Sequence, residues 1–335
     1  MNTVKTIVNN FCIIKDYFQD SYIYANLLPS QNPNDSILTL NNFKLDRKIN
    51  LKLHNIQQID VKKAEEILPK LPRLQENQSP LKFKENFNTH FQYIKLKKLK
   101  KIILQNNFEG ITLDQSEKKI KINPSLNFFY IQFNDDIYIG NSPEILLAQS
   151  YNKKMILTEA VAGTRPNELK EELLECPKEI NEHFLVYKHF LNTFNLKKKH
   201  NPNLKKNGTL HHLQQIIKIK YENNQDYNDY YKTLKKIHPT PATAIYPLDI
   251  DMLHKINNKL WKRQFYSSPI TVHFPNKKTF SYVALRYLHI NKKTKTYQIP
   301  IGCGLTEASI EKNEYKETLN KKNMTLKSIG YNDDL

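Results

Sequence analysis

Short apolar runs alternate with polar turns along most of this chain, a pattern that predicts many strands separated by loops. Residues 1–75 are broken by turns such as PSQNPNDS and LDRKIN, which indicates an N-terminal layer of strands and loops. Further strands are predicted at NFFYIQF, DIYIG, MILTEAVAG, HHLQQIIKIKYE, SPITVHF, FSYVALRYLHI and KTYQIPIGCG. Helical spacing is present at residues 82–101, 167–195 and 309–327 and in NDYYKTLKKI. We therefore predict an α+β fold, or an α/β sandwich with large sheets.

Two segments between these elements are predicted to be irregular: KKKHNPNLKKNG as a solvated loop and HPTPA as a rigid turn. The N-terminus lacks the apolar region and cleavage site of a signal peptide, and no apolar run reaches membrane-spanning length. The three cysteines, Cys12, Cys176 and Cys303, have no metal-ligand spacing and are odd in number. These features predict a protein of the reducing cytoplasm, without a membrane partner.

The formal net charge of +18 raises the alternative of a nucleic-acid-binding protein, because lysine and arginine patches bind phosphate. The basic residues here are mostly lysines spread over the whole chain, not arginines clustered beside aromatic residues. We therefore attribute the charge to a general drift toward Lys, Asn and Ile, and expect no nucleic-acid partner. In an enzyme, a positive field of this kind would steer a small anionic substrate inward.

Two pairs of glutamates are candidate metal ligands. Glu179 and Glu182 are three residues apart in one predicted helix, and Glu314 and Glu317 are three apart in another. Residues at this spacing share a helix face, so each pair presents two carboxylates to one side. Oxygen ligands of this kind suit a hard cation such as Mg²⁺. The alternative is that both pairs are ordinary solvated acidic faces.

Other single residues carry weaker signals. Arg286 lies inside the strand-like run YVALRYLHI and could bind a carboxylate with its guanidinium group. Gly302 and Gly304 let backbone N–H groups approach an anion closely, in a chain with only 7 glycines. His238 is displayed by the HPTPA turn. Alone, Arg286 is equally an edge-strand surface charge, and His238 equally part of a structural turn.

Lys101 ends the basic stretch KLKKLKK and directly precedes the apolar run IIL. A lysine beside a buried strand can be desolvated, which favours the neutral amine and lets it act as a base. The alternative is one more solvated helix lysine.

Seven segments in sequence resemble the chorismate-binding enzymes, which include isochorismate, salicylate, anthranilate and aminodeoxychorismate synthases. The segments are SPE (142–144), TEAVAGTRP (158–166), KEINEH (178–183), HPTPA (238–242), ALR (284–286), GCG (302–304) and EYKETLNKK (314–322). The resemblance covers residues 80–325 and implies one chorismate-binding domain over 1–335, with residues 1–75 as a variable layer. It also implies the anthranilate-synthase-type fold, in which two large sheets enclose the active site.

The resemblance assigns roles to matched positions. It implies that Glu182 and Glu317 bind Mg²⁺ directly, with Glu179 and Glu314 nearby through water, and that the metal holds the ring carboxylate of chorismate. The residues implied to bind the rest of the substrate are Gly163, Thr164, His238, Tyr266, Arg286, Gly302, Gly304 and Lys321. Among these, Arg286 and Tyr266 would hold the pyruvyl carboxylate.

The family divides by nucleophile, and three features favour water. Lys101 matches the lysine of water-adding members, whereas amide-forming members usually have glutamine there. Ala162 replaces the nucleophilic lysine of aminodeoxychorismate synthases, and the helix after Glu182 lacks the D-L-x-R-N-D stretch of the anthranilate branch. We therefore expect an isomerase, isochorismate synthase, in which Lys101 deprotonates water for attack at C2 and Glu144 protonates the leaving C4 hydroxyl. Salicylate synthase remains the alternative, since KEINEH resembles that branch and HPTPA the isochorismate branch.

The chain also departs from the family pattern. RQFYSS (263–268) keeps the arginine and tyrosine of R-G-x-Y-x-G but loses both glycines, and Thr243, Ala244 and Ile245 follow HPTPA in place of a glycine pair. A decayed, non-catalytic homologue is therefore a further alternative. The water-using branch needs no glutaminase subunit, and we expect a monomer. The sequence leaves open whether the enzyme serves menaquinone or siderophore biosynthesis.

Overall fold

The computed structural model describes residues 10–32, 34–77, 80–207, 210–223, 225–260, 263 and 265–331. The strands of the first half are β1 (Phe11–Lys15), β2 (Tyr22–Pro29), β3 (Ile37–Asn41), β4 (Lys48–Ile59), β5 (Leu71–Glu76), β6 (Lys101–Lys118), β7 (Asn127–Phe133), β8 (Asp136–Ser142) and β9 (Ile145–Ser150). Those of the second half are β10 (Met155–Pro166), β11 (Asn203–Asn207), β12 (Leu210–Lys220), β13 (Ile245–Tyr246), β14 (Pro269–Phe274), β15 (Lys278–Val283), β16 (Tyr287–Asn291) and β17 (Thr296–Leu305).

The helices are α1 (Val61–Ile67), α2 (Pro80–Lys97), the 3₁₀ helix η1 (Asn167–Leu174), α3 (Pro177–Thr193), α4 (Tyr227–Ile237), α5 (Ile250–Leu260) and α6 (Glu311–Ser328). Local sequence explains where several of them begin. Asp60 caps α1 by accepting a hydrogen bond from the Lys63 N–H. At α4, Asp226 and Asp229 form a reciprocal capping box.

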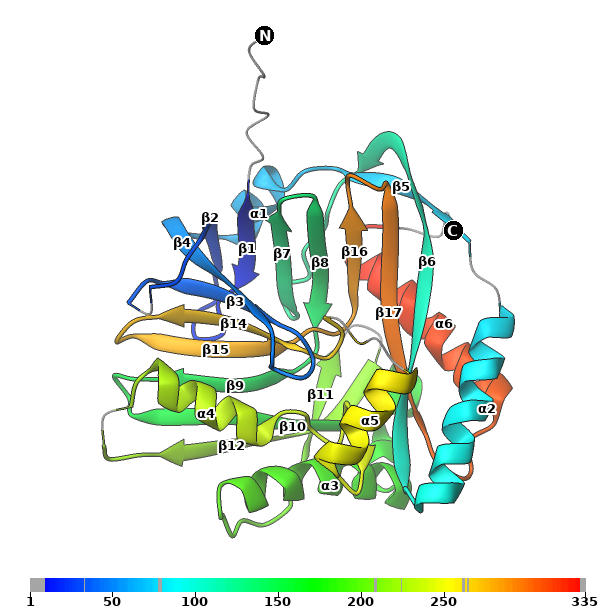
Figure 1. Ribbon diagram of the computed structural model, residues 1–335. Helices are drawn as coiled ribbons and strands as arrows, with labels where there is room; N and C mark the ends of the chain where they lie inside the picture. The colour runs from blue at the N-terminus through cyan, green and yellow to red at the C-terminus, as the bar shows by residue number, and fades with distance from the viewer. Residues whose placement is uncertain are drawn as a thin grey trace.

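All strand pairings are antiparallel and form one continuous ladder that bends into two parts. Its order is β5–β6–β17–β16–β8–β7–β1–β2–β4–β3–β14–β15–β9–β10–β12–β11, with β13 paired to the start of β6. Strands β6, β17, β16, β8 and β7 stand upright in Figure 1, whereas β14, β15, β9, β10 and β12 lie across them. The predicted fold of large sheets with flanking helices is thereby confirmed.

Strand β7 illustrates how the layers pack. It lies between β1 and β8, so both of its edges are paired. Side chains alternate across a strand: Phe128 and Tyr130 join a core that also includes residues of α1 and α6, whereas Phe129 and Ile131 join a core with β3, β14 and β15. The second core fills the space between the two parts of the sheet. This burial explains why NFFYIQF is a continuous apolar run.

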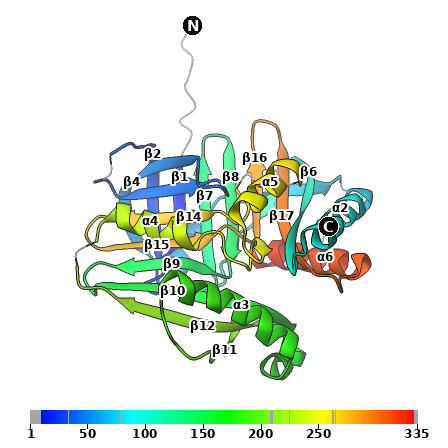
Figure 2. The ribbon, with the colours of Figure 1, turned by 60° about the horizontal axis from the view of Figure 1, so that its bottom comes forward.

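The remaining helices cover the outer faces. Helices α3 and α4 pack on β9, β10 and β12, and α3 lies on the lower side of Figure 2. Helices α2 and α5 pack near β6 and β17. Helices α3 and α6 bring their acidic residues toward the region where β6 begins and β17 ends.

Three sequence-based expectations were wrong in detail. The helix expected over 167–195 is interrupted, because Pro177 starts a new helix after Cys176. Part of the expected loop KKKHNPNLKKNG is strand β11, which pairs with the edge of β12. Arg286 does not lie inside one strand: it has φ +50 at the junction of β15 and β16. The run had to break there because β15 pairs with β9, while β16 pairs with β8.

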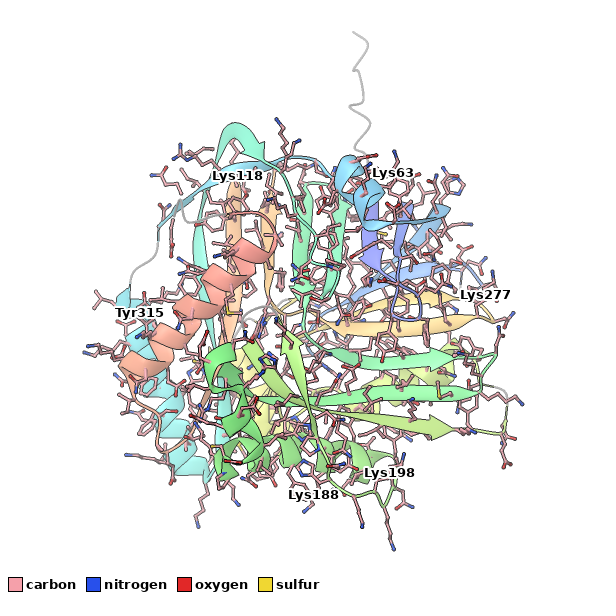
Figure 3. The ribbon with its side chains drawn as sticks, turned by 180° about the vertical axis from the view of Figure 1, so that it is seen from behind. Lys63, Lys118, Lys188, Lys198, Lys277 and Tyr315 are labelled. Carbon is pink, nitrogen blue, oxygen red and sulfur yellow. The ribbon has the colours of Figure 1, made fainter. Side chains whose placement is uncertain are left out.

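The positive charge is distributed over the molecule. The labelled lysines Lys63, Lys118 and Lys277 lie on different sides of the molecule in Figure 3, and Lys188 and Lys198 lie together at its lower end. This distribution is consistent with the compositional origin of the charge inferred from the sequence. None of the helices in the described ranges is long and apolar enough to cross a membrane.

Candidate active site

Lys101 is the first residue of β6 and is buried, with 9% of its surface exposed. Its ammonium group forms an ion pair with the Glu182 carboxylate of α3. A Cβ atom at Gly304 on the neighbouring strand β17 would lie 2.8 Å from the Lys101 Cε atom. The glycine at this position therefore makes room for the lysine side chain. The prediction that Lys101 is desolvated beside a buried strand agrees with this burial.

Gly302 makes room in the same way for Tyr266, whose ring carbon Cζ would lie 3.2 Å from an added Cβ, with the hydroxyl oxygen nearer still. The Lys321 ammonium donates to the Gly302 carbonyl oxygen at 3.0 Å and to Glu317 Oε1 at 2.6 Å. Burial acts to lower the pKa of Lys321, but the carboxylate of Glu317 raises it and prevails. Lys321 is thus a charged group held over the GCG segment.

The Gly163 backbone, with φ +72, lies against Glu179 of α3: an added Cβ would meet Glu179 Oε2 at 3.3 Å. Arg165 approaches the other oxygen of Glu179 at 3.3 Å. Glu179 is buried, whereas Glu182, one turn further along α3, faces Lys101. The i, i+3 pair predicted from the sequence therefore does share one side of the helix, but each carboxylate contacts a different cation.

The second pair lies on α6. Glu314 accepts a hydrogen bond from the Ser309 hydroxyl at 2.8 Å, and Glu317 faces Lys321. Burial raises the pKa of Glu314, and the nearby charge of Glu317 raises it further. Glu314 Oε2 is buried without a hydrogen-bond partner among the described residues.

This set of side chains fits Mg²⁺ in its chemistry. It offers carboxylate oxygens from two helices, and a cation would relieve the repulsion between Glu314 and Glu317. Within the described ranges, however, no three His, Cys, Asp or Glu side chains are grouped so that they could hold a metal ion. The reason is that Glu182 and Glu317 are turned toward Lys101 and Lys321, so both ion pairs would have to open for them to bind a metal.

Arg286 approaches the same region from the junction of β15 and β16. Burial lowers the pKa of Arg286 to about 10, an effect that Tyr266 opposes. His212 on β12 hydrogen-bonds the Gly163 carbonyl oxygen through Nδ1 at 3.2 Å. The pKa of His212 is lowered to about 3, first by burial and then by Arg286. Lys321 and Lys205 lower it further, which places three cations around one neutral imidazole.

Glu144 lies in the turn between β8 and β9, with only 3% of its surface exposed. Burial raises the pKa of its carboxyl group to about 8, with a further contribution from Glu159 that Lys205 partly offsets. Glu144 Oε1 is buried and has no hydrogen-bond partner among the described residues. A carboxyl group of this kind is protonated at neutral pH and can donate a proton.

Two predicted substrate-binding residues stand apart from these contacts. His238 is buried and hydrogen-bonds through Nε2 to the Phe43 carbonyl oxygen at 2.7 Å. Burial lowers its pKa to about 4, so it is a neutral ring tied to the N-terminal layer. The side chain of Thr164 lies outside what the structure describes, although its backbone belongs to β10.

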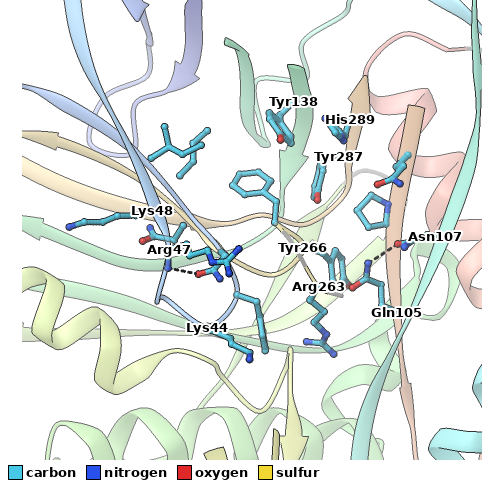
Figure 4. A pocket seen from close by; sticks show the side chains of 18 of the residues that line it. Lys44, Arg47, Lys48, Gln105, Asn107, Tyr138, Arg263, Tyr266, Tyr287 and His289 are labelled. Atoms are coloured by element: carbon cyan, nitrogen blue, oxygen red, sulfur yellow. Dashed lines mark hydrogen bonds between the residues drawn. The ribbon is translucent and has the colours of Figure 1, made fainter. Parts of the chain in front are cut away.

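A cavity of about 730 Å³ is lined in part by Tyr266. Figure 4 shows Gln105 and Asn107 beside Tyr266, with Arg263 below them and Tyr287 nearer to Tyr138 and His289. None of the four predicted metal ligands lines this cavity. The candidate site is therefore described from the paired lysines and carboxylates and not from this cavity.

Sequence reasoning missed several residues that shape the site. Arg263 is fully buried, donates to the carbonyl oxygens of Ile103 and Thr243, and lies over the Tyr266 ring. Lys205 and Glu159 lie near Glu144. The available signals were the retained arginine of RQFYSS and the acidic residue within TEAVAG. Nothing in KKKHNPNLKKNG distinguished Lys205 from its neighbouring lysines.

The two glycines of GCG are expected to respond differently to alanine. Gly302→Ala would overlap with the buried Tyr266 ring, which cannot move easily, and should lower the free energy of unfolding by about 1–3 kcal/mol. Gly304→Ala meets only the flexible end of Lys101 and should cost less. Urea unfolding of both variants measures the difference. Equal losses would show that Tyr266 does not depend on the space above Gly302.

Comparison with known proteins identifies relatives of this chain. The isochorismate synthase MenF of Haemophilus influenzae is 29% identical over 205 residues, which are 57% of this chain and 45% of that protein. Anthranilate synthase component 1 of Synechocystis is 32% identical over 120 residues, 31% of this chain and 24% of that protein. The matched regions thus span less than half the length of either relative.

Solved structures match over almost the whole chain. One is described as a 2,3-dihydroxybenzoate-specific isochorismate synthase, DhbC, from Bacillus anthracis, with a TM-score of 0.74, 16% identity and 97% coverage of both chains. Another is the menaquinone-specific isochorismate synthase MenF of Escherichia coli, with a TM-score of 0.72, 18% identity and coverage of 94% of this chain and 87% of that one. At this identity the likeness establishes the fold alone. The family described as chorismate binding enzyme matches residues 7–330, and the chain therefore belongs to the chorismate-binding enzymes.

Proposed function

We propose that this protein is an isochorismate synthase, which adds water to C2 of chorismate and removes the C4 hydroxyl. The observation that carries the proposal is the pair of groups suited to this reaction. Lys101 is a buried lysine beside Gly304, and Glu144 is a buried carboxyl group whose pKa is raised to about 8 by burial. A base and a protonated acid are the two proton-transfer groups that the reaction needs.

In this proposal, Lys101 takes a proton from water as the water oxygen bonds to C2. The ring double bonds shift, and the C4 hydroxyl leaves as water with a proton from Glu144, so atoms and charge balance. Arg286 and Tyr266 bind one substrate carboxylate, because a guanidinium group and a hydroxyl both donate to carboxylate oxygens. Lys321, which donates to the Gly302 carbonyl, adds positive charge to the same anion site.

Mg²⁺ would be held by Glu182 and Glu317, and when bound it would neutralise the ring carboxylate and orient the ring. The Lys101–Glu182 ion pair would have to open for Glu182 to take this role, which would release the Lys101 side chain to approach water. The protein would act in the cytoplasm. It would need no glutaminase subunit, since water and not ammonia is the nucleophile.

The direct test is incubation of the purified protein with chorismate, with and without Mg²⁺, followed by chromatography and mass analysis of the products. Isochorismate in equilibrium with chorismate, formed only with Mg²⁺, is the expected result. Salicylate together with pyruvate would assign the protein to the salicylate synthases. No conversion at any Mg²⁺ concentration would contradict both and favour a non-catalytic homologue.

Glu317→Gln is expected to weaken Mg²⁺ binding about 10–100-fold, since one carboxylate ligand is lost while the shape of the side chain is kept. Titration calorimetry with Mg²⁺ alone measures the affinity independently of turnover. Glu311→Gln, at the start of the same helix α6, is the matched control and should bind Mg²⁺ as the wild type does. Equal affinity of both variants would remove Glu317 from the proposed metal site.

A further inference from the structure

Glu159 on β10 is a buried carboxylate that the proposed reaction does not use. Its surface is 5% exposed, and it accepts three hydrogen bonds. Tyr17 donates to Oε1 at 3.1 Å, and Lys205 and Gln214 donate to Oε2 at 2.8 and 2.9 Å. Three donors from three different segments stabilise a negative charge at this position.

Lys205 connects this carboxylate to the turn that carries Glu144. Its ammonium group contacts Glu159 Oε2 and lies 3.4 Å from the carbonyl oxygen of Pro143, the residue directly before Glu144. Lys205 comes from β11, the strand that the sequence did not reveal, and β11 is held by β12. The Glu159–Lys205 ion pair is therefore fixed by β10, β11 and β12 directly behind the turn.

We propose that Glu159 and Lys205 form a charge pair that positions Glu144 and sets the pH range over which Glu144 can donate a proton. The inference rests on the proposed role of Glu144 as the acid. The contact between Lys205 and the Pro143 carbonyl fixes the turn, so the Glu144 carboxyl group is held in place although its own Oε1 has no described partner. Glu159 and Lys205 therefore act through Glu144 and are positioning residues.

The electrostatic effects of the two residues on Glu144 have opposite signs. The pKa of Glu144 is raised mainly by burial, then by Glu159, and it is lowered by Lys205. The other titratable groups around the pair do not ionise near pH 8: burial raises the pKa of Tyr17 and of Tyr282. His212, which faces Lys205 from β12, has its pKa lowered to about 3 and stays neutral.

The experiment compares the pH dependence of kcat in Glu159→Gln and Lys205→Met. Glu144 must be protonated to act, so activity falls as the pH rises through its pKa. Glu159→Gln removes the charge that raises this pKa and should move the alkaline limb to lower pH by about 0.5–1 unit. Lys205→Met removes the charge that lowers it and should move the limb to higher pH by a similar amount. A purely structural role would lower the rate without moving the limb in opposite directions.

Glu76→Gln is the matched control, because Glu76 also forms an ion pair with a buried lysine, Lys322, but near β5 and α6. Its alkaline limb should coincide with that of the wild type. Infrared difference titration of the wild type against Glu144→Gln reports protonation of Glu144 even in a protein without turnover, so the inference is tested separately from the proposed function. The inference would be overturned if the titration of Glu144 stayed unchanged in Glu159→Gln and Lys205→Met, or if it shifted in the same direction in both.

Discussion

Replacing Lys101 with alanine is expected to reduce isochorismate formation by about 10²–10⁴-fold, the usual contribution of a positioned general base. The effect should fall on kcat, because Lys101 is proposed as the base, whereas the substrate carboxylate is assigned to Arg286 and Tyr266. Steady-state rates with chorismate at saturating Mg²⁺ measure it. Removing the lysine also leaves Glu182 without its counterion, so Mg²⁺ affinity should rise or stay constant.

The neighbouring residue provides the control for this variant. Lys100 carries the same charge one position earlier but is exposed, and its described hydrogen bond is made by its backbone N–H to the Tyr246 carbonyl oxygen. Lys100→Ala should therefore keep wild-type kcat. A Lys101→Ala enzyme that retains more than about a tenth of the wild-type kcat would contradict the assignment of Lys101 as the base.

The sequence predicted most of the elements because burial leaves a local pattern. The apolar run at β7 is continuous since β1 and β8 cover both of its edges and two cores cover its faces. The break at Arg286 left no such pattern, because Ala284 before it and Tyr287 after it are both buried apolar residues. Only the pairing of β15 with β9 and of β16 with β8 requires the chain to turn there. Strand pairing is a tertiary property, and a short stretch of sequence does not reveal it.

The candidate site could be predicted in its residue types but not in its contacts. Spacing placed Glu179 with Glu182 and Glu314 with Glu317, and the structure brings these helices to one region. Spacing could not show that Lys101 pairs with Glu182, since these residues are 81 positions apart. The pair of Glu317 and Lys321 is different, because residues four apart on one helix are neighbours and their contact follows from spacing. Likewise, Lys205 became recognisable only after β11 was seen to pair with β12.

Replacing Glu144 with glutamine is expected to lower kcat by about 10²–10⁴-fold, because the amide keeps the shape of the carboxyl group but cannot protonate the leaving hydroxyl. KM for chorismate should change little, since none of the proposed carboxylate-binding residues is altered. Glu76→Gln is again the control and should retain wild-type kcat. If Glu144→Gln kept its activity and its alkaline limb, another group would have to supply the proton.

The same variant has a second expected effect, on stability, which tests the state of Glu144 without any substrate. The pKa of Glu144 is raised from 4.5 to about 8 in the folded protein. Between these values the folded protein keeps the proton while the unfolded chain has released it, so the free energy of unfolding falls as the pH rises, by up to about 1.4 kcal/mol per pH unit. Below pH 4.5 and above pH 8 this contribution is constant.

Glu144→Gln has no such proton, and its stability relative to the wild type should therefore increase between pH 5 and pH 8, as measured by urea unfolding at each pH. A parallel pH dependence in both proteins would mean that Glu144 is ionised in the native state, and the acid role proposed for it would fail together with the tuning by Glu159 and Lys205.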